Sequence, residues 1–244
     1  MLTQYQLALF PDGPCRPRAE WGYRLYAALL EAAPALFGAD AHRDGVTPVS
    51  QFFTAEKGSL LWTVSLLGGE SEGALGPVLA GTDRFRLRKD GLDLTVRERR
   101  VRGVPDVDSL LAQGGAHRGP HRLKFRTATA FKSRGQYLNL PTGRLIIQSL
   151  IKKWNGCFPD CPIEDDDGAG MEALAAGLRC AQFHLRDRTY YLKGGAIPGF
   201  TGELTLENRL TGFHRQLASA LLLFSGYAGV GVKTALGMGG VETE

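Results

Sequence analysis

The stretch GYAGVGVKTALGMGG, residues 226–240, places six glycines in fifteen positions beside a single charge, Lys233. Ordering glycine costs more backbone entropy than ordering any other residue, so this run indicates an unusual backbone shape or a close backbone approach. A nucleotide-binding loop is disfavoured, because the dinucleotide fingerprint and the P-loop both open a helix after a strand, whereas these glycines follow the helical pattern 209–227. Two interpretations stay open: a long structural turn, or a surface of backbone N–H groups against a phosphodiester chain.

The apolar residues of the first half indicate several strands and one helix. From Glu20 to Phe37 they recur at spacings of three and four, which predicts the helix. The basic stretch 84–103 alternates charged and apolar residues and turns near Lys89–Gly91, which predicts a β-hairpin. The other strand candidates are residues 2–10, 49–53, 59–67 and 77–81.

The second half repeats this order more regularly. Its predicted elements are a strand at 121–132, a helix at 141–155 starting with Pro141, paired strands at 178–186 and 189–195, a strand at 199–207, a helix at 209–227 and a last strand at 237–242. Strand, helix, strands, helix, strand is the β-α-β-β-α-β order. We therefore predict an α+β protein of two tandem ferredoxin-like (RRM-like) domains, residues 1–116 and 117–244, of which the first is less regular and shows no late helix.

The net charge is only +4, but the charges are unevenly distributed. Residues 84–126 hold twelve Lys or Arg and five Asp or Glu, and residues 117–134 hold six Lys or Arg and no acid. The acids gather in the segment 159–172. This separation predicts a basic face opposite a solvated acidic loop, although any one cluster is equally explained by a soluble surface.

Four cysteines and the lack of a signal-peptide pattern predict a cytoplasmic protein without a disulfide framework, and no apolar run is long enough to span a membrane. Cys157, Cys161, Cys180 and His184 together could supply four zinc ligands. Their spacings are loose and Cys180 lies in an apolar strand candidate, so buried free thiols are favoured. We expect no metal and no cofactor.

Several motifs together resemble those of the RAMP superfamily. The segment 226–240 has the superfamily's form G-x-G-x-K-x-x-x-G-x-G after an apolar helix. FRTATAFKSRGQYLNLPTGRLIIQSLIKKW (125–154) resembles the family's F-x-T-P-x-x-F strand followed by proline and a helix, with Ala128 where proline is usual, and GFTGELTL (199–206) resembles its G-F-x-G strand. With the strand, helix and histidine of the N-terminal part, the chain is similar to the CRISPR-associated endoribonucleases that cut precursor crRNA within the repeats.

The resemblance implies a metal-independent reaction in which the ribose 2′-OH attacks the adjacent phosphate and leaves 2′,3′-cyclic phosphate and 5′-OH ends. Histidine suits the general acid or base. His42 lies in the loop after the first helix, where the family's catalytic histidine usually occurs. A tyrosine on that helix and a lysine after the histidine are less clear: Leu30 occupies the expected tyrosine position, so Tyr26 and Lys57 are the nearest candidates.

Lys and Arg suit contacts with RNA phosphates. The predicted RNA-binding residues are Arg122, Lys124, Arg126, Lys132, Arg134, Lys193, Gly226, Gly229, Gly231, Lys233, Gly237 and Gly239. His117 and His121 are expected to contact RNA or solvent, and His121 is the next choice of base. His184 and His214 are expected to be structural.

The expected partner is CRISPR repeat RNA or crRNA, with other CRISPR effector subunits possible, and the chain is expected as a monomer or homodimer. The alternative function is a non-catalytic RAMP subunit that only binds crRNA.

Overall fold

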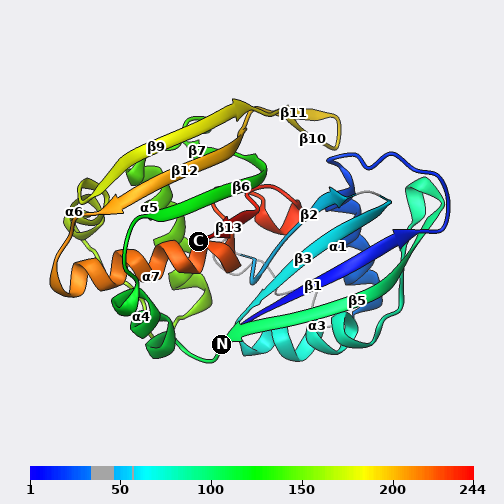
Figure 1. Cartoon of the computed structure of the whole chain (residues 1–244), viewed down its shortest axis with the longest axis horizontal. Helices are drawn as coiled ribbons and strands as arrows, with labels where there is room; N and C mark the ends of the chain where they lie inside the picture. Colours follow the sequence, from blue (N-terminus) through cyan, green and yellow to red (C-terminus); the bar gives the residue numbers. More distant parts are fainter. Residues whose placement is uncertain (34–46, 57) are drawn as a thin grey trace.

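The computed structural model describes residues 1–33, 47–56 and 58–244. Two α/β units lie side by side, with the glycine-rich segment between them (Figure 1). Among the described residues, no helix is both long and apolar enough to cross a bilayer.

The N-terminal unit is a five-stranded antiparallel sheet backed by two helices (Figure 1). Its elements are β1 (Leu2–Pro11), α1 (Trp21–Ala32), β2 (Val49–Glu56), β3 (Ser59–Leu67), α3 (Gly69–Gly81), β4 (Arg84–Leu87), the 3₁₀ turn η2 (Arg88–Asp90) and β5 (Leu92–Val104). The strand order β2-β3-β1-β5-β4 places the first strand beside the last long strand, as the ferredoxin-like order requires, with β4 added as the other arm of the predicted hairpin. Strand alternation buries Leu7 and Leu9 of β1 against Leu25 and Leu29 of α1.

The C-terminal unit has the same topology. Its elements are α4 (Val107–Ala116), β6 (His121–Thr129), β7 (Phe131–Ser133), β8 (Gln136–Leu138), α5 (Gly143–Cys157), α6 (Ala169–Ala176), β9 (Leu178–Asp187), β10 (Tyr190–Leu192), β11 (Gly195–Ile197), β12 (Phe200–Asn208), α7 (Gly212–Ala228), η3 (Thr234–Leu236) and β13 (Val241–Thr243). The main sheet has the order β13-β6-β12-β9, and β7–β8 and β10–β11 form two small separate hairpins. The predicted α+β fold of two ferredoxin-like units is confirmed.

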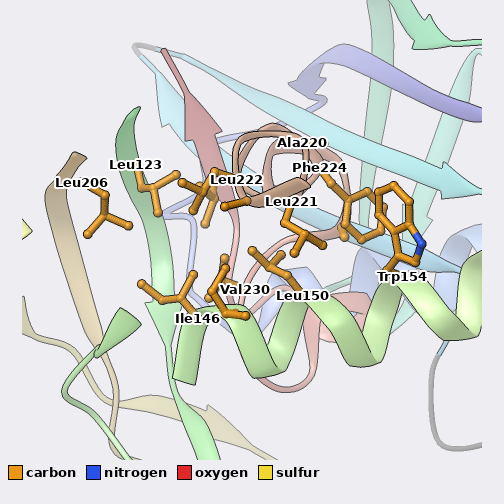
Figure 2. Packing of buried hydrophobic residues seen from close by; sticks show 14 of the residues in the cluster. Leu123, Ile146, Leu150, Trp154, Leu206, Ala220, Leu221, Leu222, Phe224 and Val230 are labelled. Atoms are coloured by element: carbon orange, nitrogen blue, oxygen red, sulfur yellow. The ribbon is translucent and has the colours of Figure 1, made fainter. Parts of the chain in front are cut away.

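Helices α5 and α7 form the centre of the larger core (Figure 2). Ile146, Leu150 and Trp154 recur at a spacing of four along α5 and are all buried. The Trp154 ring meets the Phe224 ring of α7 edge to face, with centroids 5.7 Å apart. This packing fixes the C-terminal end of α7, from which the glycine-rich segment leaves.

Several local predictions were wrong. Residues 77–81 are the end of helix α3, not a strand; Leu75 and Leu79 bury one helical face, a period that so short a run does not reveal. Residues 178–186 do not pair with 189–195, because β9 pairs with β12 while β10 pairs with β11. Pro141 lies before the start of α5, whose cap is Thr142; the Thr142 Oγ1 accepts a hydrogen bond from the Leu145 N–H.

Candidate functional site

The glycine loop, residues 226–240, lies at the junction of the two units (Figure 1). Two buried glutamine side chains tie it to the N-terminal sheet. The Gln4 Nε2 donates to the Gly226 carbonyl at 2.8 Å, and the Gln51 Nε2 donates to the Ala235 carbonyl at 2.9 Å. The loop is therefore part of the contact between the units.

The glycines of the loop approach the protein's own backbone. Gly237 has φ +95°, and a Cβ there would lie 2.8 Å from the Gly22 Cα of α1. A Cβ on Gly231 would collide with the Ala130 carbonyl. Gly226, Gly229 and Gly239 are buried as well. Close packing thus explains the glycine content, and the RNA contact predicted for these glycines stays a prediction.

One stretch of the glycine loop, Gly231–Leu236, lines a cleft of about 970 Å³, which we call the cation cleft. Helix α1, helix α5 and the β7–β8 and β10–β11 hairpins supply its other walls. Its principal lining residues are Tyr23, Tyr26, Leu30, Thr47, Lys132, Arg134, Ser149, Lys152, Lys153, Lys193, Gly231, Lys233 and Thr234. Six of these carry positive charge and none is acidic, so the cleft favours an anion.

Three basic residues of the cation cleft stand in the left-handed backbone region. Arg134, Lys193 and Lys233 have φ of 48°, 49° and 58°, and they are the only non-glycine residues with positive φ in the described part of the chain. This conformation costs a non-glycine residue roughly 1 kcal/mol or more. Within residues 1–33, 47–56 and 58–244, none of the three forms an ion pair. Three tight turns therefore present to one cleft cations that no described acidic residue neutralises.

Tyr23 and Tyr26 of α1 form another wall of the cation cleft. Tyr26 is 6% exposed, and burial raises the pKa of its phenol, so the hydroxyl keeps its proton at neutral pH. The Lys193 ammonium lies 5.4 Å from the centre of the Tyr23 ring, a cation–π contact that connects the β10–β11 hairpin to α1. Tyr26, the predicted catalytic tyrosine, thus lies in the same cleft as Lys132, Arg134, Lys193 and Lys233.

His42 and Lys57, the other two predicted catalytic residues, lie outside the described residues. Leu30 and Thr47, which precede and follow the segment 34–46, both line the cation cleft. Their catalytic roles stay predictions.

A second cleft of about 510 Å³, the sheet cleft, lies between β2 and the C-terminal sheet. Its charged and aromatic lining residues are Arg18, Phe53, Lys124, Phe125, Arg126, His184, Arg186, Arg188, Tyr190 and Glu203. Lys124 pairs with Glu203 at 3.7 Å and Arg126 with Glu242 at 3.5 Å. Arg122 lies outside both clefts and pairs with Glu244. Apart from Arg122, the predicted basic RNA-binding residues are thus divided between two clefts, and those on β6 are partly neutralised.

The expectations for His121, His184 and His214 were wrong. His121 is 2% exposed; its ring stacks on His117 with centroids 3.9 Å apart, and its Nε2 lies 3.0 Å from the Ser219 Oγ. Burial, with His117 and Arg215 nearby, lowers the pKa of His121 to about 4. His184 and His214 are exposed rather than structural, and His184 lines the sheet cleft.

The possible zinc ligands do not form a site. No group of three or more His, Cys, Asp or Glu side chains within the described residues could hold a metal ion. Cys157 is a buried free thiol, as favoured, whereas Cys161 and Cys180 are exposed. Cys180 lies on β9, the edge strand of its sheet, where most side chains are exposed.

Sequence reasoning missed Lys153. This α5 residue lines the cation cleft and donates hydrogen bonds into the glycine loop. Its only sequence signal is its position among Leu150, Trp154 and Cys157, which places a lysine beside a buried helical face.

Comparison with known proteins decides the family. A model of the family "CRISPR-associated endoribonuclease Cas6" matches residues 123–241. The chain is 30% identical over its whole length to the CRISPR-associated endoribonuclease Cas6 of Mycobacterium tuberculosis, of which it covers 78%. This chain belongs to the Cas6 family. Cas6 endoribonucleases are members of the RAMP superfamily, so the resemblance of the motifs is confirmed.

Other Cas6 proteins can be aligned with this chain over nearly their full length. The Cas6 of Streptococcus thermophilus is 26% identical and is aligned over 93% of each chain. The solved product complex of the Cas6 protein TTHA0078 superposes with a TM-score of 0.79 at 25% identity, covering 100% of this chain and 99% of that one. Both ferredoxin-like units and the cation cleft between them therefore belong to the part of the chain shared with Cas6.

Proposed function

We propose that this protein cuts precursor crRNA within CRISPR repeats without a metal ion, leaving 2′,3′-cyclic phosphate and 5′-OH ends. The observation that carries the proposal is the cation cleft, which Arg134, Lys193 and Lys233 all line without an acidic partner among the described residues. A phosphodiester group fits this charge. The product complex of TTHA0078 supports the proposal, since that relative was solved with its product.

The reaction transfers two protons, forms one P–O bond and breaks another. A base takes the proton of the ribose 2′-OH, the new P–O2′ bond forms as the P–O5′ bond breaks, and an acid protonates the leaving 5′-oxygen. We assign one of the proton transfers to His42. Lys233, Arg134 and Lys193 would stabilise the charge that develops on the phosphoryl oxygens. Tyr26, whose phenol stays protonated, would donate a hydrogen bond, and Lys57 would add positive charge.

RNA would extend beyond the scissile group over both clefts. Lys132 lies in the cation cleft, and Lys124 and Arg126 in the sheet cleft could contact phosphates of neighbouring nucleotides. Repeat RNA is thus the proposed partner. Other CRISPR effector subunits, and a monomeric or homodimeric state, remain predictions.

Cleavage of labelled repeat RNA in EDTA tests the proposal. We expect one specific cut whose upstream product can be extended at its 3′ end only after the cyclic phosphate is removed. His42→Ala should lower the single-turnover rate by about 100-fold or more. His214→Ala, an exposed histidine outside both clefts, is the control and should stay within about twofold.

Three outcomes would contradict the proposal. Loss of cleavage in EDTA would show that a metal is needed. An undiminished rate in His42→Ala would place the general acid or base on another residue. Binding of repeat RNA without cleavage would instead support the non-catalytic crRNA-binding alternative.

A further inference from the structure

Lys153 is half-buried, and its ammonium group contacts the end of α7 and the glycine loop. It donates hydrogen bonds to the Ala228 carbonyl at 2.8 Å, the Gly229 carbonyl at 3.0 Å and the Thr234 Oγ1 at 3.3 Å. An ammonium has three N–H donors, and here all three have acceptors within the protein. Lys153 therefore has no donor left for RNA, although it lines the cation cleft.

The surroundings of Lys153 explain how a buried charge is tolerated. Two of its acceptors are carbonyls at the C-terminal end of α7, where the helix dipole favours a cation. Cys157 on its own helix is the charged or titratable group that interacts with it, and Lys152, Lys233 and Tyr26 line the same cleft. Burial lowers the pKa of Lys153 to about 7, and the nearby Cys157 opposes this shift.

The contacts of α5 hold an arc of the glycine loop at both ends. Lys153 binds its start, Ala228 and Gly229, and its end, Thr234. One helical turn earlier on α5, the Ser149 Oγ accepts a hydrogen bond at 2.9 Å from the Gly231 N–H. Lys233, which directly precedes Thr234, lies in the part of the arc that faces the cleft.

We propose that Lys153 is a positioning residue for cleavage: it fixes the arc 228–234 so that Lys233 is held over the cation cleft. This inference rests on the proposed role of Lys233 at the phosphate. Replacing the ammonium with an apolar group would leave two buried carbonyls and a hydroxyl without their partner. The arc would then relax, and Lys233 would lose its fixed position.

A double-mutant cycle on single-turnover cleavage by the full chain tests the coupling. Lys153→Met keeps the length of the side chain and removes its donors. We expect Lys153→Met and Lys233→Met each to lower the rate about tenfold or more, and the double variant to lie within about threefold of the slower single variant. Lys152→Met is the matched control: it removes the neighbouring charge of the same cleft, and its effect should multiply with that of Lys233→Met.

Ser149→Ala keeps the proposal testable if Lys153→Met unfolds at the assay temperature. It removes the other α5 contact to the arc without changing charge, and its smaller loss of rate should likewise disappear in the Lys233→Met background. The positioning role would be overturned if the rate losses of Lys153→Met and Ser149→Ala both multiplied with that of Lys233→Met in the double variants. An unchanged cleavage rate in both single variants would also overturn it. The rate of each variant is divided by the wild-type rate under the same conditions. If cleavage turned out to need a metal ion, the proposed metal-independent mechanism would be refuted, but the comparison of variants would still test the role of Lys153.

Discussion

Lys153 and His121 show two ways in which this fold buries an ionisable side chain. Lys153 satisfies every donor of its ammonium with an acceptor. Among the described residues, His121 has one side-chain hydrogen-bond partner, the Ser219 hydroxyl, and it stacks on a second histidine with Arg215 nearby. The first arrangement gives an ammonium three acceptors, although burial lowers the pKa of Lys153 to about 7, whereas the second favours the neutral ring.

His121 should therefore make the fold sensitive to acid. The unfolded chain binds a proton at His121 below a pKa of 6.5, but the folded chain does so only near pH 4. Its contribution is complete above pH 6.5, and the free energy of unfolding should fall by roughly 3 kcal/mol from this residue as the pH drops to 4. Urea denaturation across this range should show a shallower pH slope in His121→Gln; an identical slope would contradict the assignment.

At the scale of single elements, the β7–β8 and β10–β11 hairpins use the same turn chemistry. Arg134 precedes Gly135 and Lys193 precedes Gly194, and all four residues have positive φ. Glycine at the first position would serve the turn better, since it adopts this conformation without steric cost. The proposed contact with an RNA phosphate in the cleft would explain why a cation occupies this strained position.

The substitution Arg134→Gly removes the charge of this turn while keeping its backbone conformation, so its effects on stability and on RNA binding can be measured separately. Relief of the left-handed strain and the added freedom of the unfolded chain oppose each other, so the free energy of unfolding should change by less than about 1 kcal/mol. Affinity for a non-cleavable 2′-deoxy repeat RNA should fall, and the slope of log K against log salt should become shallower by about 0.7–0.9. Lys89→Gly, at the exposed turn of the β4–β5 hairpin, is the control and should leave the salt slope unchanged. An unchanged slope in Arg134→Gly would mean that Arg134 contacts no phosphate.

At the scale of the whole molecule, the glycine loop joins the two ferredoxin-like units. Gln51 of β2 lies at the centre of this junction. Its Nε2 donates to the Gly22 and Ala235 carbonyls, and its Oε1 accepts from the Trp62 Nε1 at 2.9 Å. One buried amide thus links β2, α1, β3 and the glycine loop.

Gln51→Met should weaken this junction. Methionine has a similar volume but leaves two carbonyls and one indole N–H unpaired in a buried place, which should cost about 2–4 kcal/mol in the free energy of unfolding. Urea denaturation measures this change, with Gln6→Met on the half-buried face of β1 as the control. A loss below about 0.5 kcal/mol would show that these hydrogen bonds contribute little to holding the units together.

The local pattern of the sequence determined the secondary structure and the topology class. Alternation along β1, β3 and the β4–β5 hairpin, and the spacing of four in α5, depend on neighbours close in the chain, so they could be recognised without coordinates. The short apolar run at 77–81 was misassigned because a few residues do not show a period. The motif around Lys233 pointed to the family and to a cation at the site.

Only the tertiary structure decided what the glycines approach and which cations share a cleft. Gly237 lies against Gly22, and Lys153 against Gly229, although more than 70 residues separate each pair. Burial of His121 likewise depends on α7, which is distant in the chain. Such contacts are set by how helices and sheets pack in space, a property that no local pattern records. The glycine-rich stretch by itself predicted an unusual backbone, and packing assigned most of it to the junction of the two units and one stretch to the cation cleft.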